Sequence, residues 1–144
     1  MELSCKVDYA CIALIQLAIR HGQGQPISVN EIAHSQNIPI RYLDQVMGML
    51  RRAGIITSQR GAKGGYHLAQ EPWQIRIIDV VVALNGDDSR ESQNDSQITA
   101  EKLVIADIRE LARKGAIDVL SKHTLEDLVR KCEEKKRSGI MFYI

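Results

Sequence analysis

The sequence predicts a mainly α-helical (α+β) fold with one short β-hairpin and a long helix near its C-terminal end. Within residues 39–66, apolar side chains recur at the spacing of a helix that buries one face: Leu43, Val46, Met47 and Leu50. Gly54 stands where a helix is expected to end, and a short strand and a basic, glycine-rich hairpin tip follow it. A helix with a polar outer face followed by such a hairpin is typical of a winged helix-turn-helix with a two-stranded wing.

Composition and charge fit that interpretation without proving it. The 144 residues carry a formal net charge of +1, and they suit one domain, or one small domain with an assembly element. Residues 1–70 hold seven Lys and Arg against four Asp and Glu, whereas residues 71–144 hold twelve against fourteen. The front half is therefore mildly basic (7 − 4 = +3) and the back half mildly acidic (12 − 14 = −2), which favours a polyanionic partner for the front half.

The cysteines and the apolar runs predict a cytoplasmic protein. Cys5, Cys11 and Cys132 are odd in number and follow no disulfide spacing, which favours a reduced compartment. No apolar stretch reaches the length of a membrane span, and the N-terminal run lacks the features of a signal peptide. We expect Cys11 in the core, while a redox-sensing role for Cys5 or Cys132 stays open.

The first third of the chain supplies the remaining parts of a helix-turn-helix. Residues 4–21 predict a helix that is apolar on two sides, so it is buried between two layers, such as the DNA-binding unit and a dimer partner. Ser28 and Glu31 have the spacing of a capping box, in which each side chain accepts from a free backbone amide at the start of a helix. That helix should end near Gln36, and Asn37 should make the turn into the next one.

The chain after residue 84 predicts a loop and an assembly region. We assign residues 1–84 to the DNA-binding domain, 85–97 to a flexible polar loop, and 98–144 to a dimerisation helix, a short capped helix and an apolar tail. One stripe of the long helix is apolar and predicts a dimer contact; its members are Val104, Ile108, Leu111, Ala112 and Val119. Gly115 either lies within this helix or divides it, and the two alternatives stay open.

Three segments carry a resemblance to a known family. Tyr42-Leu-Asp-Gln45, Leu50-Arg-Arg-Ala-Gly-Ile55 and Arg60-Gly-Ala-Lys-Gly-Gly-Tyr66 closely resemble the Rrf2 family of bacterial regulators. The resemblance extends over nearly the whole chain. It implies a homodimer of winged helix-turn-helix units, a transcriptional regulator that binds a palindromic operator as a repressor.

The resemblance also implies which residues contact double-stranded DNA. Arg41, Asp44 and Gln45 would face base edges in the major groove, and Arg60 would enter the minor groove. Asp44 is one methylene shorter than the Glu of similar proteins, which changes the geometry of that contact. Lys63, Arg51 and Arg52 would contact phosphates, although the two helix-end arginines also suit the helix dipole alone. The full set is Ser28, Arg41, Tyr42, Asp44, Gln45, Arg51, Arg52, Arg60, Gly61 and Lys63.

Two further expectations concern a cofactor and a protein partner. Family members with an iron–sulfur cluster place three cysteines in the loop before the long helix, but residues 85–97 contain neither Cys nor His. We therefore expect no cluster, no metal and no other cofactor, as in the cluster-free branch that regulates cysteine metabolism. The apolar tail Phe142, Tyr143 and Ile144 either folds back on the dimer core or, as in that branch, binds the enzyme O-acetylserine sulfhydrylase.

No catalytic constellation or nucleotide-binding glycine motif is present in the sequence, so we expect no enzyme activity. Two alternatives to a DNA-binding repressor stay open. One is an interaction protein that signals through its tail to a cysteine-synthesis enzyme. The other is a redox or metal sensor with atypical ligands.

Overall fold

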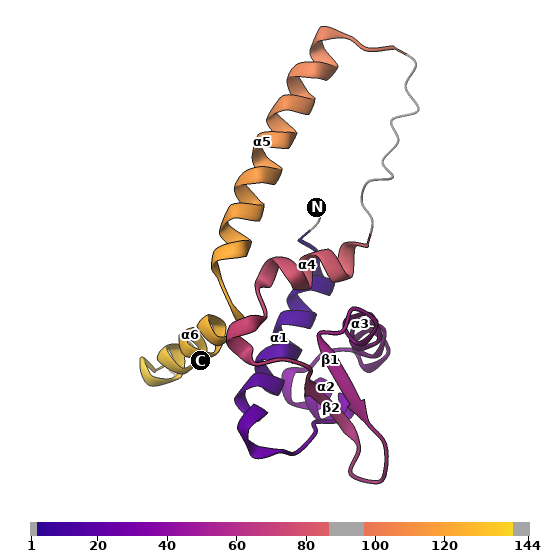
Figure 1. Ribbon diagram of the computed structural model, residues 1–144, viewed down its shortest axis with the longest axis vertical. Helices are drawn as coiled ribbons and strands as arrows, with labels where there is room; N and C mark the ends of the chain where they lie inside the picture. The colour runs from indigo at the N-terminus through magenta and orange to yellow at the C-terminus, as the bar shows by residue number, and fades with distance from the viewer. Residues whose placement is uncertain (1–2, 87–96, 140–144) are drawn as a thin grey trace.

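The computed structural model describes residues 3–86 and 97–139 of the chain (Figure 1). These residues form six α-helices, two short 3₁₀ turns and one two-stranded antiparallel sheet, so the predicted mainly helical winged fold is confirmed. In chain order the elements are α1 (Cys5–Ile19), η1 (His21–Gln23), α2 (Val29–Gln36), α3 (Ile40–Arg52), β1 (Ile56–Gln59), β2 (Gly65–Leu68), η2 (Pro72–Gln74), α4 (Ile77–Asn85), α5 (Ala100–Lys122) and α6 (Leu125–Arg137).

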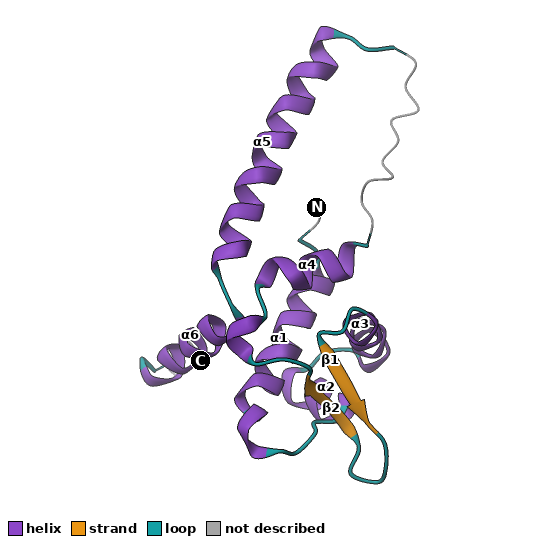
Figure 2. Ribbon diagram, viewed as in Figure 1, coloured by secondary structure: helices purple, strands orange, loops and turns teal. Residues whose placement is uncertain are grey.

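The helix-turn-helix consists of α2 and α3, which pack against each other and on α1 (Figure 2). Asn37 makes the turn between them in the left-handed region, with φ of 53°, a conformation that asparagine tolerates better than most residues. On α3 the four apolar residues named above are buried, as the periodicity predicts. The helix ends at Arg52, and Gly54 adopts a φ of +78° just beyond it.

The wing lies close to the start of α2 because Ile27, which precedes that helix, pairs with Tyr66 of β2. β1 and β2 are antiparallel, with Ile56 opposite Leu68 and Gln59 opposite Gly65. The N–H of Ile27 donates to the carbonyl of Tyr66 at 3.1 Å, and the N–H of Tyr66 donates back at 2.8 Å. The wing is thus tied to the chain that leads directly into α2.

α1 is the central helix of the core, and it packs against α3, α4 and α6. The sequence predicts two apolar sides for this helix, and α6 of the same chain forms part of its second layer. Leu125, at the start of α6, is fully buried in the common core. Thr124 and Asp127 cap α6 reciprocally, the side chain of each accepting from the backbone N–H of the other at 3.2 and 2.9 Å.

α5 is one continuous helix of 23 residues that passes through Gly115 without a break. It projects away from the rest of the molecule (Figure 1), and its C-terminal end leads into the linker to α6. That linker is fixed to the start of α4: Ile77 N–H donates to the His123 carbonyl at 2.9 Å, and Leu125 N–H donates to the Ile75 carbonyl at 2.8 Å. The C-terminal end of α5 is therefore anchored beside the winged unit.

Two of the predicted segments lie outside the described residues. They are most of the polar loop, residues 87–96, and the tail residues Phe142, Tyr143 and Ile144. Among the residues that are described, no helix is both long and apolar enough to cross a lipid bilayer.

Candidate nucleic-acid interface

The outer face of α3 is polar and open to solvent. Arg41, Asp44 and Gln45 are exposed, while the four apolar residues on the opposite face of the helix are buried. Tyr42 lies between the two faces and is half-buried. Its ring packs edge-on against Tyr9 of α1, with the centroids 5.4 Å apart and an interplanar angle of 83°. This contact holds α3 against α1 and leaves the three polar side chains free to meet a ligand.

The tip of the wing presents two cations on a tight turn. Arg60, Gly61 and Lys63 are all exposed, and Gly61 has a φ of +121° that favours glycine. A side chain at Gly64 would place its Cβ 2.5 Å from the carbonyl oxygen of Gln59. The turn therefore depends on glycine at 61 and 64, and α3 and the wing lie on the same side of the unit (Figure 2).

Arg51 and Arg52 are exposed in the last turn of α3. At this position a cation interacts favourably with the helix dipole whether or not it also meets a phosphate. Their geometry is compatible with both interpretations of the sequence.

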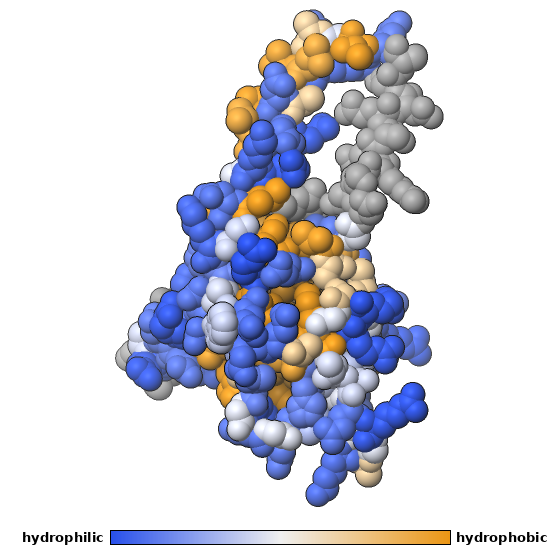
Figure 3. Space-filling model, viewed as in Figure 1, coloured by the Kyte–Doolittle hydropathy of each residue, from blue (hydrophilic) through white to orange (hydrophobic). Residues whose placement is uncertain are grey.

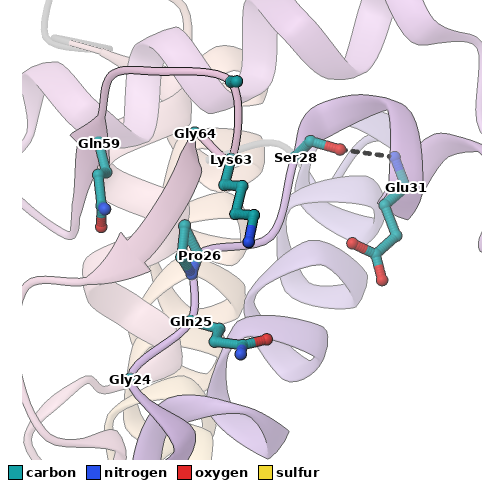
Figure 4. Close-up of a pocket in the computed structure, with 9 residues that line it drawn as sticks. Gly24, Gln25, Pro26, Ser28, Glu31, Gln59, Lys63 and Gly64 are labelled. Carbon is teal, nitrogen blue, oxygen red and sulfur yellow. Dashed lines mark hydrogen bonds between the residues drawn. The ribbon is translucent and has the colours of Figure 1, made fainter.

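A polar pocket of about 560 Å³ lies between the wing, the loop before α2 and the first turn of α2 (Figure 4). Its polar lining residues come from all three segments: Gln25, Ser28, Glu31, Gln59 and Lys63. Ser28 and Lys63, which are far apart in sequence, are thus brought to one site. Sequence reasoning missed Gln25, Gln59 and Glu31 as members of this surface, because only the pairing of Ile27 with Tyr66 puts their segments together.

The predicted capping box of α2 is half correct. The hydroxyl of Ser28 accepts from the backbone N–H of Glu31 at 3.1 Å, as expected. The carboxylate of Glu31, however, pairs with the guanidinium of Arg20 at the end of α1. The ion pair replaces the second hydrogen bond of the box because α1 ends within reach of Glu31, which local sequence spacing does not reveal.

The cysteines of the chain lie on two of its helices. Cys5 and Cys11 lie on α1 and Cys132 on α6, and burial raises the pKa of the Cys11 thiol to about 11, with Asp8 adding to the effect. Within residues 3–86 and 97–139, no three His, Cys, Asp or Glu side chains gather around a common point.

A helix-turn-helix, an exposed polar face on its second helix and a basic hairpin on the same side define a winged helix-turn-helix DNA-binding protein. The chain also matches the sequence profile of the Rrf2 family, described as an iron-dependent transcriptional regulator, over residues 3–131. The chain therefore belongs to the Rrf2 family, and it is a DNA-binding transcriptional regulator.

Individual relatives agree with that assignment. The chain is 35% identical to the transcriptional regulator CymR of Bacillus subtilis over 144 residues, which cover 100% of each chain. The solved structure of CymR, described as the global cysteine regulator of B. subtilis, superposes with a TM-score of 0.70 over 91% of this chain and 98% of that one. IscR of T. potens superposes with a TM-score of 0.78 at 31% identity, over 100% of this chain and 97% of the other. CymR and a curated IscR relative, that of Cereibacter sphaeroides, are both named as transcriptional regulators and not as enzymes.

Proposed function

We propose that this protein is a homodimeric repressor that binds a palindromic operator and works without an iron–sulfur cluster. The observation that carries the proposal is the surface of α5. Within the part of the chain that the structure describes, none of the 23 residues of this helix is buried. A row of large apolar side chains exposed along one projecting helix is typical of an assembly interface and rare on a monomer.

The exposed stripe and the face of α5 that meets its own chain are different faces. Arg113 and Ile117 line a pocket of about 210 Å³ against α4, so this side of α5 is already partly covered. Val104, Ile108, Leu111 and Val119 are 55–65% exposed. Val119 is two positions from Ile117, and two positions on a helix point nearly opposite ways. Figure 3 shows apolar side chains gathered on the upper part of α5, where a second copy of the chain would pack.

Dimer symmetry supports the form of the operator. A two-fold axis relating two α5 helices would also relate two α3 helices. A symmetric pair of recognition helices binds an inverted repeat. In each half, Arg41, Asp44 and Gln45 would read the major groove and Arg60 the neighbouring minor groove. A dimer seated over a promoter represses transcription because it excludes the polymerase from the same DNA.

We also propose that the protein binds no iron–sulfur cluster and that it works in the cytoplasm, associated with the nucleoid. Residues 85–97 lack Cys and His, so the usual cluster ligands are missing from the place where the family carries them. We further propose that Phe142, Tyr143 and Ile144 bind O-acetylserine sulfhydrylase, and the similarity to CymR, described as a global cysteine regulator, fits a partner from cysteine synthesis.

Selection from a random duplex library tests the central proposal. The purified protein should enrich an inverted repeat, and sedimentation of the selected complex should give two protomers per duplex. Enrichment of a single asymmetric site bound by one protomer contradicts the dimeric mode of binding. Transcription in vitro from a promoter that contains the selected site should fall when the protein is added.

The tail proposal needs its own measurement. Calorimetry with O-acetylserine sulfhydrylase should show binding by the full chain and none by a chain that lacks residues 142–144. Equal binding by both chains removes the tail as the contact.

A further inference from the structure

We propose that Arg20 maintains DNA affinity by neutralising Glu31, a carboxylate that otherwise faces the DNA backbone beside the wing. The inference rests on the proposed function, and it deepens it by adding a positioning residue that acts through another side chain. Neither Arg20 nor Glu31 belongs to the set of DNA contacts predicted from the sequence.

The position of Glu31 is unfavourable for a DNA-binding surface. Glu31 lies in the first turn of α2 and lines the same pocket as Ser28 and Lys63 (Figure 4). Lys63 comes from the wing, which is the segment that approaches DNA in this fold. A phosphate drawn toward the Lys63 ammonium and the positive end of α2 therefore also approaches the Glu31 carboxylate, which repels it.

Arg20 cancels that repulsion from outside the pocket. It is the residue after the last turn of α1, eleven positions before Glu31, and its guanidinium donates to the Glu31 carboxylate. With Arg20 present, the three charges of Lys63, Glu31 and Arg20 sum to +1. Without it, the sum is zero at the point where the wing and α2 would meet the backbone.

The pair contributes little to the stability of the fold. Its side chains are 39% and 46% exposed, and ion pairs that exposed are screened by water and salt. Ser28 already satisfies the backbone N–H of Glu31, so the helix keeps that part of its cap without the ion pair. Its main consequence is thus the local charge that a polyanion encounters.

Four variants of the full-length protein test the proposal by fluorescence anisotropy with a selected operator and a scrambled duplex. Arg20→Ala should weaken binding to both duplexes by about three- to tenfold, because the repulsion does not depend on base sequence. Arg20→Lys should bind like the wild type, since it keeps the charge. Glu31→Gln should bind as tightly as the wild type or a few-fold more tightly, and the double variant Arg20→Ala with Glu31→Gln should recover the affinity that Arg20→Ala loses.

Arg130→Ala is the matched control. Arg130 also pairs with a carboxylate at the start of a helix, that of Asp127, but it lies on α6 away from the wing. It should bind DNA like the wild type. Thermal unfolding of each variant shows whether it is folded. If Arg20→Ala does not fold, Arg20→Gln serves as a second neutral variant.

Two results overturn the inference. If Arg20→Ala and Arg20→Gln both bind with unchanged affinity, the charge of Arg20 has no effect on binding. If the double variant remains as weak as Arg20→Ala, Arg20 contacts a phosphate itself and does not act through Glu31. A wild-type protein that binds neither duplex would instead refute the proposed function, so the two failures are distinguishable.

Discussion

Gly65 is the residue that sets how closely the wing approaches α2. A Cβ added at this position would lie 2.5 Å from the carbonyl carbon and oxygen of Ile27 and 2.8 Å from the nitrogen of Ser28. All three are backbone atoms, so no side-chain rotation can relieve the contact. The pocket between the wing and α2 therefore depends on a glycine that does not itself line it.

Gly65→Ala should destabilise the fold by about 1–3 kcal/mol, because β2 must move away from Ile27 to accept the methyl group. Chemical denaturation measures the change. Gly22→Ala is the matched control, since nothing lies within 4 Å of a Cβ at Gly22, and its stability should change by less than about 0.5 kcal/mol. Equal stability of the two variants would mean that the close approach of the strands is not required.

Arg60 and Lys63 stand three residues apart in the wing, but we expect them to contribute differently. Arg60→Ala should weaken operator binding by about 1–3 kcal/mol and reduce the preference for operator over scrambled DNA, because an arginine in the minor groove responds to its width. Lys63→Ala should weaken both duplexes to a similar extent, because a phosphate contact carries little sequence information. Mobility-shift titration on the two duplexes separates these effects. If Arg60→Ala loses the same affinity for both duplexes, Arg60 contacts the DNA phosphates and does not respond to the groove.

Local spacing in the sequence predicts which residues share the exposed face of one helix, but it does not predict contacts between helices. The polar face of α3 is periodic, so the sequence alone assigns Arg41, Asp44 and Gln45 to one exposed surface. The ion pair of Arg20 with Glu31 joins residues of two different helices, and nothing in the sequence specifies the angle at which those helices meet. The DNA contacts themselves are inferred from resemblance to a family, and they stay predictions.

In α5, too, the sequence predicts one feature of the helix and not another. Its apolar stripe could be predicted because a helix repeats every few residues, but its continuity could not. Glycine has a low helix propensity, so Gly115 could end a helix. It also follows Arg113 and Lys114, and basic residues are common just before a C-terminal glycine cap. The structure keeps the helix intact across it, so the stripe forms one surface from Val104 to Val119.

Ile108→Asp should convert the protein from dimer to monomer. Ile108 is 60% exposed in the middle of the stripe, and a dimer would bury the new carboxylate without a partner, at a cost of about 3 kcal/mol or more. Sedimentation at several protein concentrations measures the dissociation constant. The helix itself should remain folded, which circular dichroism can verify.

The control for this variant is Lys114→Asp, which introduces the same side chain into α5 outside the stripe. It should leave the dimer intact. A wild-type protein that sediments as a monomer, or two variants with equal effect, would show that the stripe is not the interface.

On the scale of the whole molecule, the C-terminal end of α5 is attached directly to the winged unit. The backbone bonds of Ile77 with His123 and of Leu125 with Ile75 tie the end of α5 to the start of α4, and α6 then packs back on α1. Because these hydrogen bonds fix the C-terminal end of α5 to the winged unit, the dimer contact and the DNA-facing surface should behave as one rigid arrangement. The division into a domain at 1–84, a loop at 85–97 and an assembly region at 98–144 stays a prediction. Leu125 of α6 lies in the same core as the residues of α1 to α4.

This arrangement leads to a prediction about the salt dependence of operator binding. Three cationic side chains per protomer, Arg51, Arg52 and Lys63, are candidates for phosphate contacts, and two protomers would neutralise about six phosphates. The logarithm of the binding constant should therefore fall with the logarithm of salt concentration at a slope of about −5. If the dimer binds as one unit, the Ile108→Asp monomer should show about half that slope on a half-site duplex. Anisotropy titrations across a range of salt concentrations measure both slopes. A wild-type slope near zero would mean that contacts with the DNA phosphates contribute little to binding. Equal slopes for the wild type and Ile108→Asp would mean that the two protomers do not bind together.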